Sequence, residues 1–238
     1  MRRDSLFIGA ITLMCAACLS SEPTPESASK PPATVVTDMA SINDGKTWEL
    51  VNVNASLQEE GDKKYVLLQV VDDKPIIDTP SAVGIAYIAN LEFSEGIIEV
   101  DLKGKNVFQE SFVGIAFGGV DQRTYEATYF RPFNFNPDDA ARRLRAVQYI
   151  SWPDHPWERF RDEHPGVYEK PVNPVPDPDS WFHARIEVTK ENVNVFVEGA
   201  EAPSLTVARV GAREKGKVGL WTDMYEGRFA NLRITPAE

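Results

Sequence analysis

Cysteine is scarce in this chain of 238 residues: Cys15 and Cys18 are the two present, and both lie within the first eighteen positions. The remainder therefore has no disulfide, no cysteine-built zinc site and no thiol nucleophile. Basic residues are also in the minority, with 25 Lys and Arg against 36 Asp and Glu, for a formal charge of −11. This balance argues against nucleic acid as a partner, because binding a phosphate backbone usually needs a basic face. The sequence also lacks an HExxH motif, a Gly-x-Ser-x-Gly elbow and a phosphate-binding glycine loop.

Long hydrophobic runs are missing as well. The apolar run at residues 6–14 is too short to span a bilayer and follows two arginines, which is typical of a secretory signal. It ends in Cys15-Ala16-Ala17-Cys18, which resembles the lipobox of bacterial lipoproteins. The resemblance implies a signal peptide at 1–17, a lipidated Cys18, and an exported lipoprotein of the cell envelope, periplasmic or on the outer surface. Plain cleavage near Ala17, with Cys18 left as a free thiol, is the alternative.

The composition divides the rest of the chain into two parts. Residues 18–41 are rich in Ser, Thr, Pro, Glu and Ala with almost no apolar periodicity, which predicts a disordered tether. Residues 42–238 have the length of one all-β domain.

Short segments rich in Val, Ile, Phe and Tyr recur along this domain and predict an all-β fold, an antiparallel sandwich. Period-two alternation on both sides of Lys190-Glu191 predicts a hairpin. The twelve segments are 48–53, 65–71, 84–93, 96–102, 112–117, 124–131, 146–151, 181–189, 192–198, 204–209, 217–222 and 228–234.

Two short helices are expected in an aromatic-rich insertion between residues 131 and 181. Asn136-Pro137-Asp138-Asp139 supplies an N-cap, a first-turn proline and first-turn acids. His155-Pro156-Trp157-Glu158 opens the second helix, and Pro165-Gly166 ends it. Long excursions from a compact sandwich are commonly functional.

Several motifs follow one another in an order that resembles the concanavalin A-like lectin/glucanase superfamily, including its laminin G-like and 3-keto-disaccharide hydrolase (glucanase-like) domains. The resemblance spans about residues 48–236 and implies a jelly-roll β-sandwich whose concave face binds carbohydrate in many members. The motifs are EGIIEVD (95–101), FVGIAF (112–117), WFHARI (181–186), VFVEG (195–199), GLW (219–221) and GRFANL (227–232).

Alternation along two of these strands separates a core face from an open face. Val113, Ile115 and Phe117 share one side of their strand, with Phe112, Gly114 and Ala116 opposite. Gly96, Ile98, Val100 and Leu102 likewise leave Ile97, Glu99 and Asp101 on the other side. If the two strands are neighbours, Glu99 and Asp101 stand in a groove above Gly114 and Ala116.

Glu99 and Asp101 are candidate catalytic residues, because their Cα atoms are about 6.6 Å apart on a strand, a spacing compatible with paired-carboxylate glycoside chemistry. Family 16 glycoside hydrolases carry a similar Glu-x-Asp-x-x-Glu pattern, but Lys103 or Gly104 stands where the third carboxylate would be. A conventional glucanase site is therefore disfavoured, and solvated or structural side chains are the alternative.

The insertion supplies the candidate ligand-binding residues, because sugars are recognised by flat apolar surfaces and by donors for their hydroxyls. The alternative is that the aromatic residues cover the sandwich edge, that the arginine pairs with an acid, and that Trp157 holds its own helix in place. The candidates are Tyr129, Arg131, Asn134, Gln148, Trp152 and Trp157.

The histidines and acids give weak signals for a metal. His155 is a further catalytic candidate beside acidic residues, and His183 is interpreted as structural. No tight transition-metal spacing occurs, so no metal site is assigned. Calcium bound through Asp121, Asp138 or Asp139 is left open, because oxygen ligands need no distinctive spacing.

The leading hypothesis is a lipid-anchored, extracytoplasmic module that binds oligo- or polysaccharide without catalysis and meets the membrane through its anchor alone. A hydrolase resembling the 3-keto-disaccharide hydrolases is the alternative. A cell-envelope packing or protein-contact domain is a third interpretation.

Overall fold

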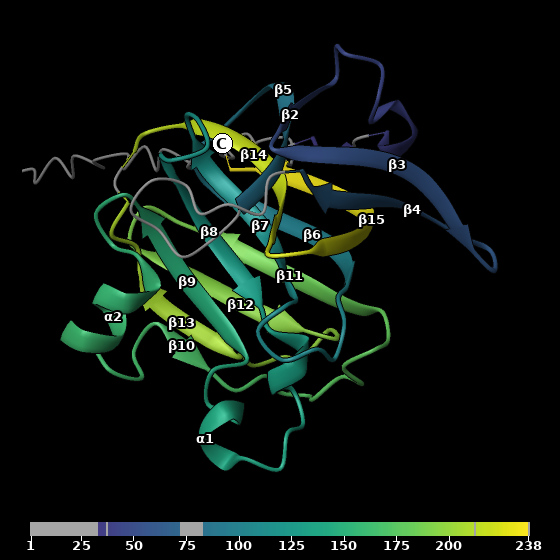
Figure 1. Ribbon diagram of the computed structural model, residues 1–238. Helices are drawn as coiled ribbons and strands as arrows, with labels where there is room; N and C mark the ends of the chain where they lie inside the picture. The colour runs from purple at the N-terminus through teal and green to yellow at the C-terminus, as the bar shows by residue number, and fades with distance from the viewer. Residues whose placement is uncertain (1–32, 37, 72–82, 212, 238) are drawn as a thin grey trace, which may run out of the picture. The chain divides into compact units, whose positions relative to one another are not determined.

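The computed structural model describes residues 33–36, 38–71, 83–211 and 213–237, which form two antiparallel β-sheets with two short α-helices (Figure 1). This confirms the predicted all-β sandwich. The predicted signal peptide, Cys18 and most of the predicted tether lie outside the described residues.

We name the two sheets A and B. Sheet A has the order β13 (Leu205–Ala208), β12 (Asn192–Val197), β11 (Phe182–Val188), β6 (Gly96–Lys103), β15 (Glu226–Pro236), β4 (Lys63–Val70) and β3 (Val53–Glu60), with β1 (Val35–Val36) also paired to β15. Sheet B has the order β10 (Glu169–Lys170), β9 (Val147–Trp152), β8 (Tyr125–Phe130), β7 (Phe112–Gly119), β14 (Gly216–Asp223), β5 (Val83–Phe93) and β2 (Trp48–Val51).

The main core lies between the sheets and is built from alternate residues of their strands. Val113, Ile115 and Phe117 of β7 belong to it, as do the alternate residues Ile98, Val100 and Leu102 of β6. Successive side chains of a strand point to opposite faces, so the other residues of β7 face away from sheet A. The predicted faces of both strands are confirmed.

Each of the twelve predicted segments overlaps a strand, and the predicted hairpin is confirmed by the pairing of β11 with β12. The longest strand that the sequence did not reveal is β3. Its sequence, VNASLQEE, has one buried residue, Val53, and no period-two pattern. The β3–β4 ribbon extends away from the body of the sandwich (Figure 1), so neither face of its outer end needs apolar side chains.

The folded part begins earlier than the predicted boundary at residue 42. Val35 and Val36 pair with Ile234 and Arg233 of β15, and a 3₁₀ turn, η1, follows at Met39–Ser41. The Asp38 side chain caps that turn by accepting a hydrogen bond from the Ala40 amide at 2.9 Å. Part of the predicted tether, residues 35–36 and 39–41, thus carries a short strand and a 3₁₀ turn, because backbone pairing with a neighbouring strand does not depend on apolar periodicity.

The two helices of the insertion are confirmed, with one correction. α2 (Trp157–Glu163) begins and ends as predicted and lies beside β9 (Figure 1). α1 (Ala140–Arg143) is capped by Asp139, whose side chain accepts from the Ala141 amide at 2.8 Å, so the cap is not Asn136. Phe135 is buried at the end of the 3₁₀ turn η2 (Pro132–Asn134), and the chain leaves the core before it turns into α1.

Candidate functional site

Sheet B carries a second apolar cluster on the face turned away from sheet A. Tyr87, Tyr125, Tyr129 and Trp221 are its large members, and each is at most 3% exposed. The rings of Tyr129 and Trp221 are stacked with centroids 4.8 Å apart. These aromatic rings form an apolar floor over the middle of this face. A sheet face that is exposed to solvent usually carries polar residues instead.

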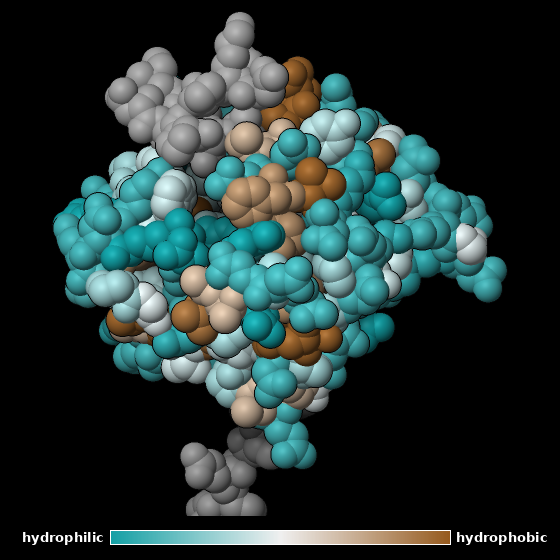
Figure 2. All heavy atoms as spheres, turned by 60° about the horizontal axis from the view of Figure 1, so that its bottom comes forward, coloured by the Kyte–Doolittle hydropathy of each residue, from teal (hydrophilic) through white to brown (hydrophobic). Residues whose placement is uncertain are grey.

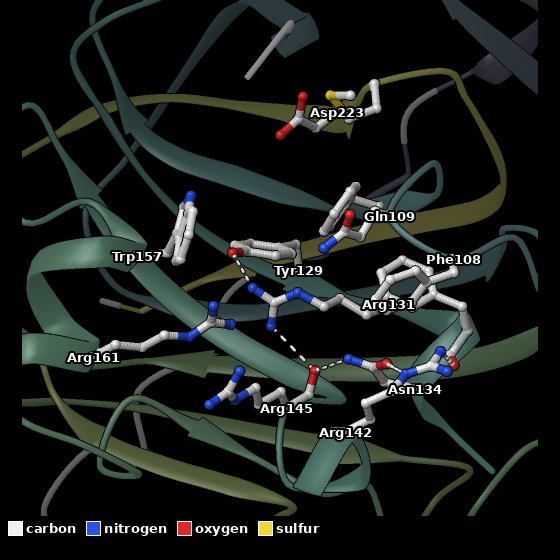
Figure 3. A pocket seen from close by; sticks show the side chains of 13 residues that line it. Phe108, Gln109, Tyr129, Arg131, Asn134, Arg142, Arg145, Trp157, Arg161 and Asp223 are labelled. Carbon is white, nitrogen blue, oxygen red and sulfur yellow. Dashed lines mark hydrogen bonds between the residues drawn. The ribbon is translucent and has the colours of Figure 1, made fainter. Parts of the chain in front are cut away.

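A pocket of about 330 Å³ opens at one end of this floor (Figure 3). Its size falls within the usual range for small-molecule sites. Strands β7, β8 and β14 supply its base, and the β6–β7 loop and the segments around η2, α1 and α2 supply its walls. The lining residues are Phe108, Gln109, Phe112, Tyr129, Arg131, Phe133, Asn134, Arg142, Arg145, Trp157, Arg161, Asp223 and Met224.

Arg131 lies at the centre of the pocket and is held from several sides (Figure 3). Its guanidinium donates to the Tyr129 hydroxyl at 2.8 Å, to the Arg145 carbonyl at 3.1 Å, and to the side-chain oxygen of Gln148. The side chain is 6% exposed. Burial lowers the pKa of Arg131, and the nearby Arg161 and Arg145 act in the same direction. A guanidinium nevertheless stays charged in proteins, so this pocket contains a fixed, buried cation.

Tyr129 and Gln148 form the base beneath that cation. Tyr129 donates to Gln148 Oε1 at 2.9 Å while accepting from Arg131. Burial raises the pKa of Tyr129 to about 12, so its hydroxyl remains a neutral donor. Within the described part of the chain, the buried Nε2 of Gln148 has no hydrogen-bond partner. A buried, unpaired amide donor costs folding free energy.

Trp157 and Arg161, one turn apart on α2, form one wall. The Arg161 guanidinium lies 4.5 Å from the Trp157 ring centroid and binds the Glu169 carboxylate at 2.8 Å. Glu169 lies on the edge strand β10 and is 7% exposed. Arg145 and Arg131 also approach this carboxylate, at 3.3 and 3.7 Å. One acid therefore holds three of the pocket's arginines in place.

The facing wall comes from loops on the other side. Phe108, in the β6–β7 loop, is 53% exposed and packs edge-on against Phe133 of η2. The Arg142 guanidinium lies 4.3 Å from the Phe108 ring centroid and donates to Asn134 Oδ1 and to the Phe133 carbonyl. The end of the sandwich that carries α1 is mostly hydrophilic, with separate hydrophobic patches (Figure 2).

The predicted ligand-binding residues fall into three groups. Tyr129, Arg131, Asn134 and Trp157 all line this pocket. Gln148 lies directly under it through its hydrogen bonds. Trp152 instead lines a separate depression with Pro153 and Pro156 beside α2. Whether any of these residues binds a ligand stays a prediction.

The predicted groove of Glu99 and Asp101 above Gly114 and Ala116 is wrong. Strand β6 belongs to sheet A and pairs with β11 and β15, whereas β7 belongs to sheet B. Both acids face outward from sheet A. The two predicted faces were correct, but the neighbouring strands were not, because alternation does not specify pairing partners.

Glu99 and Asp101 instead line a shallow pocket on sheet A with His183, Asn231 and Arg233. Asp101 accepts hydrogen bonds from His183 at 2.9 Å, Lys63 at 2.8 Å and Asn231 at 2.7 Å. Burial opposes ionisation of Asp101, but these hydrogen bonds outweigh it and hold its pKa well below the usual range. In return the bond to Asp101 raises the pKa of His183 above 6.5.

This arrangement has the character of an ion-pair network on the outside of a sheet. His155, the third catalytic candidate, lies elsewhere, with its ring stacked 5.5 Å from that of Phe160. The structure thus does not bring the three catalytic candidates together.

Two of the three candidate calcium ligands, Asp121 and Asp139, take part in local structure. Asp121 accepts from the Arg123 amide at 2.7 Å, and Asp139 caps α1. Among the residues that the structure describes, no group of three or more His, Cys, Asp and Glu side chains is placed to hold a metal ion.

Sequence reasoning missed most of the charge in the pocket. Arg142, Arg145 and Arg161 come from α1, the turn after it, and α2, and nothing in their spacing connects them. Phe112 and Asp223 are paired residues on neighbouring strands of sheet B. The number of arginines between residues 131 and 161 is the signal that would have indicated a basic site.

Comparisons with known proteins support the fold. No protein-family model matches the chain, and no curated protein matches it in sequence. Among solved structures, the carbohydrate-binding module CBM66 of Bacillus subtilis matches with a TM-score of 0.51 and 12% identity, covering 80% of this chain and 96% of the module. A Bacillus licheniformis β-glucanase matches with a TM-score of 0.53 and 14% identity, covering 88% and 100%.

The exoplasmic/lumenal domain of VIP36, in a Ca²⁺-bound form, matches with a TM-score of 0.53 and 9% identity, covering 86% of this chain and 90% of that domain. The chain therefore has the concanavalin A-like jelly-roll fold, as the sequence motifs implied. At these identities the likeness establishes the fold, and function has to be argued from the site. No helix in the described residues is long and apolar enough to cross a membrane.

Proposed function

We propose that this domain is a non-catalytic carbohydrate-binding module whose ligand occupies the pocket between Phe108 and Trp157. The observation that carries the proposal is an aromatic-walled pocket with fixed hydrogen-bonding groups inside it. Flat apolar rings suit the C–H faces of sugars, and guanidinium and amide groups donate to their hydroxyls. The position on an outer sheet face, in a fold shared with a carbohydrate-binding module, supports the same conclusion.

The pocket is built to bind with little rearrangement. Arg131 and Asn134 are both anchored on the Arg145 carbonyl, at 3.1 Å each. Side chains that are already held lose little conformational entropy when a ligand arrives. A pre-organised polar site of this kind contributes specificity as well as affinity.

The alternative, a glycoside hydrolase, has the β-glucanase fold in its favour. Glycoside hydrolysis generally needs two carboxyl groups, about 5–5.5 Å apart in retaining enzymes and about 6.5–9.5 Å in inverting ones. Asp223 is the one carboxylate among the described residues that line the pocket. Glu169 lies behind the wall, engaged by arginines. The geometry therefore supports binding over hydrolysis.

We further propose that the chain is exported and anchored through a lipid on Cys18, so that the module faces the outside of a membrane. The support is the signal-like N-terminus and the lipobox resemblance at residues 15–18. Residues 18–32 would then act as the tether.

The test is a glycan array followed by calorimetry on the best ligand, with Trp157→Ala as the variant. Trp157 is a pocket wall, so its loss is expected to weaken binding by about 2 kcal/mol, roughly 30-fold in Kd. Trp152→Ala is the matched control, because Trp152 packs against the same outer cluster but lines a different depression.

Thermal unfolding of both variants shows whether an affinity loss comes from the site or from the fold. An array without any bound glycan, or equal losses in the two variants, would overturn the assignment of this pocket. Release of shorter sugars from a bound ligand would instead favour the hydrolase.

A further inference from the structure

The pocket has the opposite charge to the protein that carries it. The chain has a formal charge of −11, yet four arginines line this one cavity. Among the described residues, two carboxylates belong to the same site, Asp223 in the lining and Glu169 behind it. Counted over these described residues, the site has a formal excess of two positive charges.

The positive charge is only partly neutralised by ion pairs. Three arginines share the Glu169 carboxylate, and the distance from Arg131 Nη1 to Glu169 Oε2 is 3.7 Å. In the described structure Arg142 has no carboxylate partner: it binds the Asn134 side-chain oxygen, the Phe133 carbonyl and the Phe108 ring. Arg145 is 49% exposed at the pocket wall. Buried or half-buried guanidinium groups without full compensation are favourable partners for an anion.

The positive and negative side chains also lie on opposite sides of the pocket. Arg142, Arg145 and Asn134 lie on one side of the pocket, and Asp223 lies on the other (Figure 3). The arginine side suits a carboxylate or sulfate oxygen, whereas a carboxylate such as Asp223 accepts from hydroxyl groups. Between them stand the aromatic rings of Tyr129 and Trp157, which suit a sugar ring.

From this polarity we infer that the pocket selects anionic saccharides, sugars that carry a carboxylate or a sulfate group. The inference rests on the proposed carbohydrate-binding function and specifies its ligand class. The anionic group binds at the arginine side, and the hydroxyls of the same or the adjoining sugar face Asp223. A neutral sugar would leave the arginine side without a counter-charge, so it binds more weakly.

The experiment compares saccharides that differ only in charge. Oligogalacturonate is measured against its methyl ester, which keeps the backbone and removes the charge, and dextran sulfate oligosaccharide is measured against dextran. The charged member of at least one pair is expected to bind about tenfold or more tightly, the usual scale of one charge-assisted hydrogen bond. Its binding should weaken as salt rises from about 50 to about 500 mM, because salt screens exposed charges.

Arg145→Gln locates the effect, and Arg143→Gln is its matched control. Arg145 lines the pocket, whereas Arg143 is an exposed arginine of α1 outside it, so both variants lose one positive charge from the same short segment. Arg145→Gln is expected to weaken binding of the charged saccharide about tenfold and to weaken binding of the neutral one by less. Arg143→Gln should change neither.

Two failures can be told apart. If neutral and charged members bind equally in both pairs, or if the two variants weaken binding alike, the anionic preference is refuted while carbohydrate binding stands. If no saccharide of either kind binds, the proposed function itself fails, and this inference fails with it. Preference within the carboxylate pair or the sulfate pair identifies the anionic group.

Discussion

Replacing Glu126 by glutamine tests the buried ion pair that joins the two sheets. Glu126 of β8 is 0% exposed and Arg209, just after β13, is 5% exposed. The Arg209 guanidinium donates to both carboxylate oxygens, at 2.9 and 3.0 Å, and the Tyr149 hydroxyl adds a third hydrogen bond at 2.7 Å. Glu126→Gln keeps the size of the side chain but leaves the Arg209 charge buried without its counter-ion.

Breaking a buried pair in this way costs about 3–5 kcal/mol. For a domain of this length about 1 kcal/mol lowers Tm by roughly 2–4 °C, so a loss near 4 kcal/mol corresponds to about 8–16 °C. Total stabilities are commonly about 5–15 kcal/mol, so the variant should still fold but with much of its stability gone. The assay is urea denaturation at neutral pH followed by circular dichroism, with Tm as a second measure.

Glu92→Gln is the matched control, because Glu92 and its partner Lys215 are 68% and 62% exposed. Exposed pairs are worth about 0–1 kcal/mol, so this variant should be close to the wild type. The double variant Glu126→Gln, Arg209→Met should recover part of the loss, since it removes the stranded charge. A Glu126→Gln loss below about 1 kcal/mol, or one equal to the Glu92→Gln loss, would refute the reasoning.

Two further predictions concern parts of the chain away from the pocket. His183 has a raised pKa in the folded state, so the stability it contributes is complete below pH 6.5 and is lost as pH rises through the raised value. In His183→Gln the free energy of unfolding should no longer fall over this pH range, whereas in His164→Gln it should still fall. An NMR titration midpoint of His183 at or below 6.5 would contradict the prediction. Cys18→Ser should move the full-length protein from the membrane pellet to the soluble fraction of expressing bacteria, because the thiol is the proposed lipid attachment site. Cys15→Ser should leave it in the pellet, and retention of the Cys18→Ser variant there would argue against the anchor.

The pocket owes its geometry to an irregular part of the chain. η2 and α1 are each short, and neither could stand alone, since helices of one turn are not stable by themselves. They are fixed by burial of Phe133 and Phe135 and by hydrogen bonds to the Arg145 carbonyl. Rigid strands carry the floor and anchored loops carry the polar groups, a division of roles that is common in binding sites.

The sequence by itself determined most of the strands in the described residues, and the faces of β6 and β7. Alternation in Phe112–Phe117 is a local property, and local periodicity follows directly from strand geometry. The sequence also placed Tyr129, Arg131 and Asn134 among the site candidates, because aromatic and polar residues are interleaved within a few positions there. Trp157 was a further aromatic candidate from the same insertion. The order of short motifs indicated the concanavalin A-like fold.

Only the tertiary structure decided which of these elements meet. Strand β6 pairs with β11 and β15, far along the chain, so Glu99 and Asp101 lie on sheet A, away from the pocket. Arg142, Arg145 and Arg161 surround Arg131 because α1, the turn after it and α2 line one pocket at the end of sheet B, whose edge strand β10 supplies Glu169. Strand pairing and loop packing are set by contacts between distant residues, and periodicity, which relates near neighbours, does not encode them.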